Sequence, residues 1–354
     1  MNIVIKLGTQ AILSSHGAPI HAIMTSIVDQ IVATKREGHQ VVLVSSGAVG
    51  FGRSIARNQL HQEFGNSIGE KQFLASIGQH ELMHLYAQLL AKHGFVASQL
   101  LLTKQDFYTR QHYLNIARLM TETLSQSHVV PIINENDSVA IAELMFTDND
   151  ELAGLIAAQI NADQLIILSN VAGVFSGNPD EPLSTLLPVI DPAQGWPTIG
   201  TTKSTHGRGG MISKISNAKK MSQLGIETHI ASIHQPQVIR RILQDEPVGT
   251  RIIATKKKSS IKKWVAYSVP NGTITINPCL HEIIHKHQRV TSILPVGIER
   301  VDGNFAAGDV IEMLSPTQER IGLGVARYDS NKARDLLGQK NKPALIHYDY
   351  LYIF

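Results

Sequence analysis

The chain has 354 residues, of which 43% are hydrophobic and 17% charged, and its formal net charge is +3. This length and composition suit a globular protein of two domains, and so small a net charge does not by itself indicate a nucleic-acid partner. A single cysteine, Cys279, excludes a disulfide framework and a multi-cysteine zinc site within one chain. The chain lacks a signal-peptide pattern, and no apolar run approaches the ~20 residues that span a bilayer, so we expect a cytoplasmic protein without a membrane segment.

Short apolar runs alternate with segments of helical period over the first two thirds of the chain. Strands are expected at 3–5, 41–44, 95–102, 129–133, 165–168 and 227–231. Helices are expected around Ile20 to Ile31, ahead of Gly38, and at 70–93, 110–127, 150–161 and 211–224. Most of the strands are rich in Val, Ile and Leu without alternation, as in a sheet that is covered on both faces. The order predicts an α/β domain over residues 1–252, with a mainly parallel sheet sandwiched between helices.

The pattern changes after residue 252. The stretch "KKKSSIKK" at 256–263 holds five lysines in eight residues, and we expect 253–271 to be a linker. Short strands separated by turns follow, such as "GTITI" and "GDVIEML", and they predict a small β-rich domain over 272–354. A basic run can also attract the phosphates of RNA. We favour a solvated linker, because a run of charged residues is usually exposed to solvent and because no cluster of aromatic residues offers a stacking surface for bases.

Glycines and lysines follow the predicted strands, where ligands of an α/β sheet bind. Lys6 and Gly8 follow the first strand, Gly47 follows the second, and Lys214 ends the stretch "THGRGGMISK" before a helix. Glycine lets backbone N–H groups approach a ligand closely, and a glycine-rich turn that enters a helix is a ready anion site. These residues predict a cationic cradle for a transferring phosphoryl group.

A polar stretch, "NENDSVAIAELMFTDND" at 134–150, follows the fourth strand and holds five carboxylates and three carboxamides. Such residues can bind the ammonium group of an amino acid and hold the two lysines in place. The alternative is a solvated loop in which Asp148 or Asp150 caps the next helix. The P-loop, the G-x-G-x-x-G pattern after a strand and the protein-kinase motifs are all missing, so a phosphotransferase of this sequence belongs to another class.

The chain resembles the amino acid kinase superfamily and, within it, the glutamate 5-kinase family. The resemblance rests on "IKLGT", "VVLVSSGAVGFG", "VVPIINENDSVA", "DND", "LIILSNVAGVF" and "GRGGMISKISNA", which occur in the family's order. The segments "SILPVGIERVDGNFAAGDVIEML" and "GLGVARYDS" resemble a PUA domain. The resemblance covers nearly the whole chain, and it implies an amino acid kinase fold followed by a PUA-like domain.

This resemblance also implies a reaction, in which the γ-phosphoryl group of MgATP moves to the side-chain carboxylate of L-glutamate. The product is L-glutamyl 5-phosphate, in the first step of proline biosynthesis, with ATP and Mg²⁺ as cofactors. A carboxylate with a pKa of about 4.3 is already ionised at neutral pH, so no general base is required. A sibling activity with N-acetylglutamate or aspartate as acceptor stays open.

The resemblance implies roles for individual residues. The catalytic set would be Lys6, Lys214, Asp150, Gly8 and Gly47, with Asp150 orienting the lysines. The glutamate-binding set would be Ser46, Asp137, Asn149, Asn134 and Asp148. The nucleotide would lie against Lys6, Ser169, Asn170, Arg208, Gly209, Gly210, Met211, Ile212, Ser213 and Lys214. We expect no metal ligand from the protein.

Three positions depart from the family's usual pattern. Ser169-Asn170 replaces Thr-Asp, Met145 replaces a lysine, and Gln10 replaces a serine. These departures bear on nucleotide affinity and on regulation. The family further implies feedback inhibition by L-proline, a homodimer or homotetramer, and transfer of the product to the next enzyme of the pathway.

A second motif belongs to a different functional class. "HEIIH" at 281–285 matches the H-E-x-x-H zinc pattern, in which two histidines bind the metal and Glu282 acts as base. We favour an ordinary helix that starts near Pro278 and buries Ile283 and Ile284, because no third ligand follows at a recognised spacing.

Overall fold

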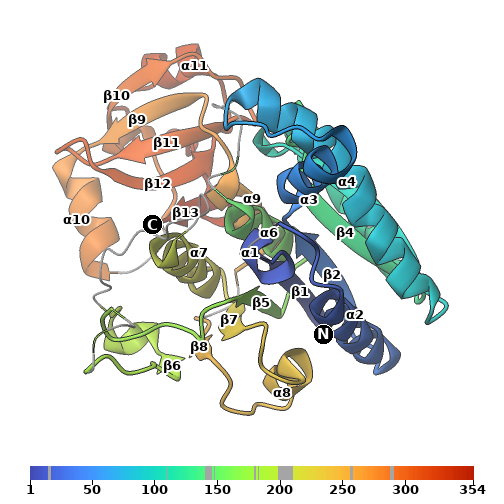
Figure 1. Cartoon of the computed structure of the whole chain (residues 1–354). Coiled ribbons are helices and arrows are strands. Elements are labelled where there is room, and N and C mark those ends of the chain that lie inside the picture. Colours follow the sequence, from blue (N-terminus) through green and yellow to red (C-terminus); the bar gives the residue numbers. More distant parts are fainter. Residues whose placement is uncertain are drawn as a thin grey trace. The chain divides into compact units, whose positions relative to one another are not determined.

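The structure is a computed structural model that describes residues 1–14, 17–108, 110–139, 146, 148–178, 181, 183–197, 210–255, 258–287 and 291–354, without the side chains of 285–287. It divides into two compact units (Figure 1). One unit comprises Met1–Asp106 and Arg110–Lys257, and the other comprises Phe107–Thr109 and Lys258–Phe354. The division falls inside 253–271, the stretch expected to be a linker. Among the described residues, no helix is long and apolar enough to span a membrane.

The first unit contains an eight-stranded sheet, counted over the described residues, in the order β3-β4-β2-β1-β5-β7-β8-β6. The strands are β1 (Asn2–Leu7), β2 (Gln40–Ser45), β3 (Val96–Leu102), β4 (Val129–Glu135), β5 (Gln164–Ser169), β6 (Val189–Ile190), β7 (Glu227–Ser232) and β8 (Thr250–Ile252). All neighbours pair in parallel except β7 and β8, which are antiparallel. The mainly parallel sheet predicted from the sequence is therefore confirmed.

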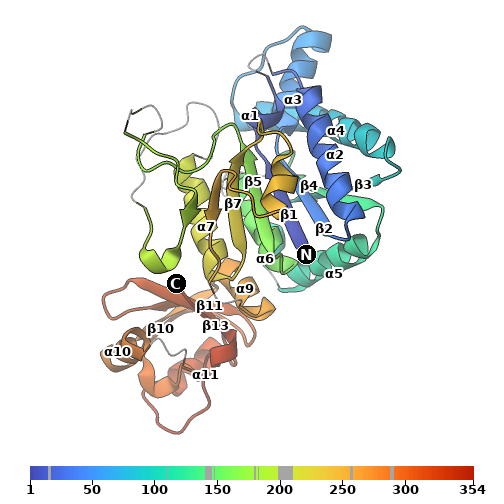
Figure 2. The same cartoon turned by 90° about the horizontal axis from the view of Figure 1, so that it is seen from below.

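Helices cover both faces of this sheet (Figure 2). They are α1 (Thr9–Ile12), α2 (His21–Arg36), α3 (Ala48–Ile55), α4 (Ile68–Ala91), α5 (Arg110–Ser125), α6 (Asn149–Gln159), α7 (Met211–Gln223) and α8 (Val238–Leu243). Shorter turns are η1 (Ala56–Leu60), η2 (Lys104–Phe107) and η4 (Pro192–Gln194). A capping box between Ser67 and Glu70 starts α4, and Asp148 caps α6.

Alternating side chains of the strands face the two layers of helices. Ile3, Ile5 and Leu7 of β1 join one core with apolar residues of α2, α4 and α8. Lys6 therefore lies on the opposite face, where α6 contacts β1 and β5 and α7 contacts α6. The same alternation in β4 puts Ile132 and Asn134 on the face of α4. The strand period thus assigns each polar residue near a strand end to one layer of helices.

Two helices of the first unit approach each other unusually closely. A Cβ atom at Gly78 of α4 would lie 1.9 Å from the carbonyl oxygen of Ala48 in α3. At Gly52 of α3, it would lie 2.0 Å from the carbonyl oxygen of Leu74. Only glycine allows this separation, so these two residues fix α4 against the helix that follows β2.

Some elements of the first unit were not predicted from the sequence. The strands β6 and β8 have two and three residues, too short for a periodic signal. β3 lies at the edge of the sheet, where Val96 is 61% exposed, so its apolar composition does not mean burial on both faces.

The second unit holds a five-stranded sheet in the order β10-β9-β11-β12-β13, counted within the described segments. Its strands are β9 (Gly272–Ile276), β10 (Ile298–Gly303), β11 (Val310–Leu314), β12 (Arg320–Val325) and β13 (Leu351–Ile353). Its helices are α9 (Ser260–Tyr267), α10 (Pro278–His287) and α11 (Ser330–Asp335), with the turns η5 (Pro295–Gly297) and η6 (Tyr348–Tyr350). Of the strand pairs that the structure describes here, only β9 and β11 are parallel, and the small β-rich domain predicted for this region is confirmed.

The helix α9 lies inside the stretch that the sequence assigned to a linker. Its Lys263, Trp264 and Val265 are buried, and the helix contacts β12 and β13. Part of the lysine-rich run is therefore packed rather than solvated.

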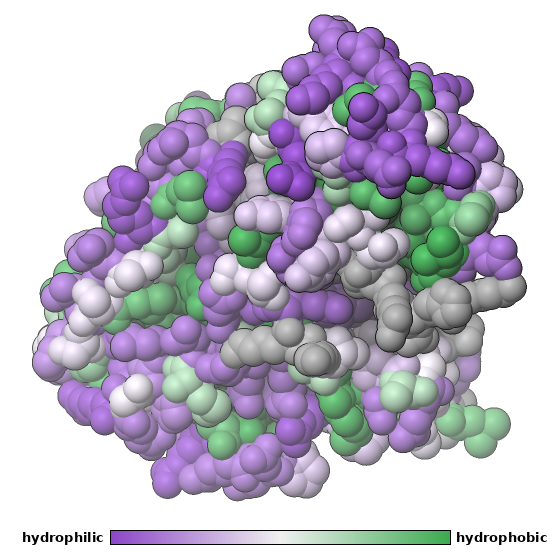
Figure 3. Space-filling view, turned by 180° about the vertical axis from the view of Figure 1, so that it is seen from behind, coloured by the Kyte–Doolittle hydropathy of each residue, from purple (hydrophilic) through white to green (hydrophobic). Residues whose placement is uncertain are grey.

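Hydrophilic residues cover much of the face drawn in Figure 3, with apolar residues in patches between them.

Candidate active site

The carboxyl ends of the central strands meet at one edge of the first sheet. Leu7, the last residue of β1, pairs with Ser45 at the end of β2 and with Leu168 near the end of β5. In β4, Ile133 pairs with Val44 of β2, two residues before the strand ends at Glu135. The turns that follow these strands therefore share one region, as expected for ligand binding in an open α/β sheet.

At this edge, Asp150 bridges the two lysines that the sequence singled out. The Nζ atom of Lys6 lies 2.6 Å from Oδ1 of Asp150, and the Nζ atom of Lys214 lies 2.8 Å from Oδ2. Lys6 comes from β1, Asp150 from the first turn of α6 and Lys214 from the first turn of α7. Asp150 is fully buried, and the two lysines are 5% and 9% exposed. Three formal charges thus form a buried cluster with a net charge of +1.

The surroundings keep Asp150 ionised. Burial by itself raises the pKa of Asp150, but the positive charges of Lys6 and Lys214 and their hydrogen bonds outweigh it. The pKa of Asp150 is therefore held below its ordinary value of 3.8. A carboxylate in this state cannot take up a proton near neutral pH, so Asp150 can position the lysines but cannot serve as a general base.

Polar contacts between α6 and α7 hold this cluster in place. Asp148 caps α6, accepting hydrogen bonds from the backbone N–H groups of Asp150 and Glu151 at 2.9 and 3.1 Å. The other carboxylate oxygen of Asp148 accepts a hydrogen bond from the hydroxyl of Ser213. Asn217 donates from its side-chain amide to the carbonyl oxygen of Asp150. The carboxylate at 148 therefore caps a helix and also joins it to α7.

A chain of carboxamides lies beside the charged cluster. The amide nitrogen of Asn149 donates to the hydroxyl oxygen of Ser46 at 2.7 Å and to Oδ1 of Asn134 at 3.0 Å. The amide nitrogen of Asn134 donates to Oε1 of Gln79 at 2.8 Å. Oδ1 of Asn149 is buried and has no hydrogen-bond partner within the part of the chain that the structure describes. This row of carboxamides therefore leaves one buried acceptor, Oδ1 of Asn149, without a partner among the described residues.

Two glycines mark the turns after β1 and β2. A Cβ atom at Gly8 would lie 3.5 Å from Nζ of Lys6, so a side chain there would cover the ammonium group. The N–H group of Gly8 makes a long 3.4 Å contact with the carbonyl oxygen of Leu168. Gly47 has a φ of 119°, which favours glycine, and a Cβ atom there would lie 2.9 Å from Cδ1 of Ile12. Both glycines keep space open at the strand ends.

The residues expected to bind nucleotide lie at the ends of β5 and at the start of α7. The hydroxyl oxygen of Ser169 is buried without a partner among the described residues. Asn170 donates to the backbone carbonyl oxygen of Gln10 at 3.0 Å, a bond that an aspartate could not make. Gly210 precedes α7 and has no side chain to cap it, so among the described residues no N-cap side chain occupies the first backbone N–H groups of the helix, which suits an anion.

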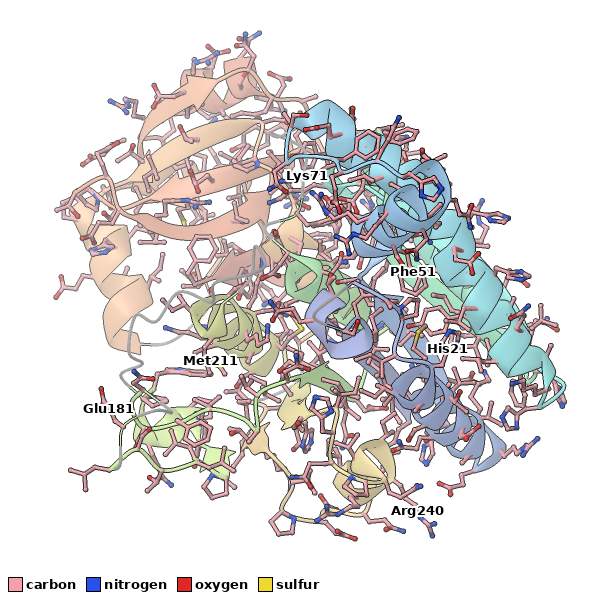
Figure 4. The ribbon with its side chains drawn as sticks, in the orientation of Figure 1. His21, Phe51, Lys71, Glu181, Met211 and Arg240 are labelled. Carbon is pink, nitrogen blue, oxygen red and sulfur yellow. The ribbon has the colours of Figure 1, made fainter. Side chains whose placement is uncertain are left out.

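Other members of the expected nucleotide set are only partly described. Met211 starts α7 and is labelled in Figure 4, and Ile212 is 53% exposed. Arg208 and Gly209 lie outside the described residues, as does Met145. Ser213 and Lys214, discussed above, belong to the same first turn of α7.

Asp137 lies in the turn that follows β4, two residues past the strand. Its neighbour Asn136 donates from its backbone N–H group to the carbonyl oxygen of Leu102 at the end of β3. Glu135 accepts a hydrogen bond from the backbone N–H group of Phe146 at 2.8 Å. Asn136 and Phe146 are thus both hydrogen-bonded to the ends of the strands β3 and β4.

The zinc motif forms part of α10, which starts at Pro278 as expected. Ile284 packs partly buried against the core of the second unit, but Ile283 is 40% exposed, so the expectation that both are buried was wrong. Neighbouring residues of a helix point about 100° apart, so Ile283 and Ile284 do not face the core equally, and Ile283 lies on the outer side. The side chain of His285 lies outside the described residues, and the described ones hold no group of three or more His, Cys, Asp or Glu that could bind a metal.

The sequence did not single out Gln79 or Asn217 as parts of this site. Both are buried, at 7% and 9% exposure, where they share the inner side of α4 and α7 with apolar residues such as Leu82 and Ala218. A polar side chain at an apolar position of an amphipathic helix is a signal that could have found them.

The chain is similar to known proteins over nearly its whole length. Residues 1–232 match the amino acid kinase family, and residues 279–343 match the PUA domain. The glutamate 5-kinase of Chlorobaculum tepidum is 44% identical over 99% of this chain and 97% of its own length. The glutamate 5-kinases of Bacteroides thetaiotaomicron and Deinococcus radiodurans are 39% and 33% identical, each over 99% of this chain and 98% and 96% of their own.

Proposed function

The chain belongs to the amino acid kinase family, and on this premise we propose that it phosphorylates the side-chain carboxylate of L-glutamate. The product is L-glutamyl 5-phosphate, in the first step of proline biosynthesis. The observation that carries the proposal is the buried cluster of Lys6, Asp150 and Lys214 beside the polar groups of Ser46 and Asn149. The names of the relatives favour neither a zinc hydrolase nor an RNA-binding protein.

The residues of the site fit a phosphorylated nucleotide. Gly8 leaves one side of the Lys6 ammonium uncovered, and the uncapped start of α7 offers backbone N–H groups. Membership of a kinase family implies ATP as the donor. Mg²⁺ is commonly held by substrate phosphates and one or two carboxylates, so it needs no dedicated protein cage. When bound, MgATP supplies the phosphoryl group and the metal shields the charge of its phosphates.

Two anions, the phosphoryl group and the glutamate carboxylate, must approach each other in this reaction. The two lysines lower the electrostatic repulsion between them. Lys6 and Lys214 would neutralise negative charge on the phosphoryl group as it moves between the two oxygens. Asp150 keeps both ammonium groups at one place, and its lowered pKa keeps it from losing its charge. Because the glutamate side chain is ionised at neutral pH, the residues need only align it and exclude water.

The acceptor would be held by the polar groups beside the cluster. Ser46 accepts a hydrogen bond from Asn149, so its own O–H group is left to donate to a carboxylate. The unsatisfied Oδ1 of Asn149 suits the ammonium group of an amino acid. Asp137 would add a negative charge for the same group. Asp148 would act through the start of α6 rather than through direct contact, since its two oxygens already accept hydrogen bonds.

The test is to trap the acyl phosphate. The protein is incubated with MgATP, hydroxylamine and L-glutamate, N-acetylglutamate or L-aspartate in turn, and hydroxamate is measured, with a reaction lacking ATP as control. Hydroxamate with L-glutamate is expected. Product only with one of the other two acids would move the proposal to that acceptor, and no product with any of them would overturn it.

Three further properties are implied by the family and remain predictions. They are feedback inhibition by L-proline, assembly into a homodimer or homotetramer, and transfer of product to the next enzyme. None rests on a contact described above.

A further inference from the structure

We propose that Gln79, on α4, is a positioning residue that sets which atom of Asn149 faces the amino acid substrate, and so sets recognition of the substrate's ammonium group. The inference rests on the proposed function and deepens it. It starts from two buried atoms without partners in the described part of the chain, Oδ1 of Asn149 and Nε2 of Gln79. They stand at the two ends of the chain of carboxamides.

The direction of each hydrogen bond in this chain is fixed. The backbone N–H group of Glu135 can only donate, and it donates to Oδ1 of Asn134 at 2.9 Å. The amide nitrogen of Asn134 must therefore lie on the other side, where it donates to Oε1 of Gln79 at 2.8 Å. Bonds at both ends of the amide stop Asn134 from rotating.

The fixed Asn134 in turn orients Asn149. Its Oδ1 accepts from the amide nitrogen of Asn149, whose second N–H donates to Ser46. Both donors of Asn149 are then used, and its oxygen is the group left for a ligand. If the amide of Asn149 turned over, it would present N–H donors where an acceptor is needed, and a positively charged ammonium group would be repelled.

The position of Gln79 is as firmly fixed as its bonding. It is 7% exposed, and it follows Gly78, whose close contact with Ala48 holds α4 against α3. Burying an amide without satisfying all its atoms costs free energy, so an apolar residue would be favoured here unless the amide had a task. Holding Asn134 in one orientation is such a task.

The matching substrate is an amino acid with a free α-ammonium group. At neutral pH this group is the strong hydrogen-bond donor that glutamate offers, since both carboxylates can only accept. Glutarate is the same molecule without the ammonium group, so the ratio of glutamate affinity to glutarate affinity isolates the contact that Gln79 controls.

The experiment compares Gln79→Leu, Gln79→Glu and Gln88→Leu. Leucine fills a similar volume but cannot accept from Asn134, glutamate can accept, and Gln88 is an exposed residue of the same helix that bonds His84. The KM for L-glutamate, the inhibition constant of glutarate, the KM for ATP and the melting temperature are measured for each.

For Gln79→Leu, the KM for glutamate should rise about ten-fold, as expected from weakening a hydrogen bond to a charged group. Glutarate inhibition and the KM for ATP should change less than about two-fold on the same basis. Gln79→Glu should retain more of the glutamate-to-glutarate ratio than Gln79→Leu, and Gln88→Leu should match the unaltered protein. A merely structural role would lower the melting temperature or the turnover without moving this ratio.

An unchanged ratio in folded Gln79→Leu would overturn the inference while leaving the proposed function intact. If the unaltered protein forms no hydroxamate with glutamate, the proposed function itself fails. The two failures are therefore distinguished by the unaltered protein alone.

Discussion

The strands of the two sheets end in different patterns. In the first unit, β4, β2, β1 and β5 run in parallel and end at one edge, where Lys6, Asp150 and Lys214 are buried together. In the second unit, β9 and β10, and β11 and β12, run antiparallel, so their ends alternate between two edges. Among its described residues, the one buried charged side chain is Lys263, on a helix.

Several charges can be buried together where strand ends meet at one edge of a sheet. Each charge loses hydration on burial, and only nearby opposite charges and hydrogen bonds offset that loss. Parallel strands deliver successive turns to one place, so partners from distant parts of the sequence can meet there. Antiparallel strands place successive turns at opposite edges, and among the described residues of the second unit the buried polar side chains other than Lys263 are the uncharged Ser268, Thr275, Ser315 and Ser330.

The largest expected effect comes from Asp150→Asn, which leaves two buried ammonium groups without their counter-charge. Breaking a buried ion pair typically costs about 3–5 kcal/mol. The free energy of unfolding from denaturant titration should fall on that scale near neutral pH, and turnover should fall with it. The matched control is Glu63→Gln, which removes an exposed ion pair with Arg57 and should change the stability little.

The same variant should show a defined pH dependence. The pKa of Asp150 is lower in the folded protein than its ordinary 3.8, so its charge stabilises the fold above that pH. This contribution is lost as the pH falls through the lowered pKa. The difference in unfolding free energy between the unaltered protein and Asp150→Asn should therefore hold from pH 7 to about 5 and shrink below 3.8. A constant difference across this range would mean that the pKa of Asp150 is not lowered in the folded protein.

Lys214→Ala tests the cationic side of the cluster. Loss of one preorganised donor to a transition state costs about 2.7–4 kcal/mol, which is roughly a 10²–10³-fold fall in kcat. Nucleotide affinity should change much less, because the lysine acts mainly on the transferring group. Steady-state kinetics with calorimetric ATP binding measures both, and Lys219→Ala on the same helix serves as the control. Equal losses in kcat and ATP affinity would mean that Lys214 only positions the nucleotide.

The smallest expected effect comes from adding one methyl group at a tightly packed glycine of each unit. In Gly78→Ala, the added carbon meets the backbone carbonyl of Ala48 at 1.9 Å, and backbone cannot move aside without shifting a helix. In Gly324→Ala, the nearest atom is Cγ2 of the Ile346 side chain at 2.5 Å. Overpacking costs about 1–3 kcal/mol, so Gly78→Ala should lose more stability and also raise the KM for glutamate by displacing Gln79. Equal stability losses, measured by calorimetry, would argue against the distinction.

The local pattern of residues was enough to predict most of the first unit. Apolar runs rich in Val, Ile and Leu marked the central strands, and apolar residues at helical spacing marked α2, α4, α5, α6 and α7. Periodicity is a local property, so it survives whatever the rest of the chain does. The same reasoning failed for the two- and three-residue strands β6 and β8, which are too short to carry a period, and for the outward Ile283 of α10.

Local patterns in the chain were enough to predict that Lys6, Asp150 and Lys214 lie near strand ends or helix starts, because turn glycines and strand ends can be read locally. The position of Asp150 between the two ammonium groups depends on long-range packing, and so does the contact of Asn134 with Gln79, which is 55 residues away in the chain. Such partners are far apart in the chain and meet only through the parallel register and the close contact of α3 with α4. The physical reason is that buried polar groups are satisfied by whatever lies nearby in space, which no local pattern encodes.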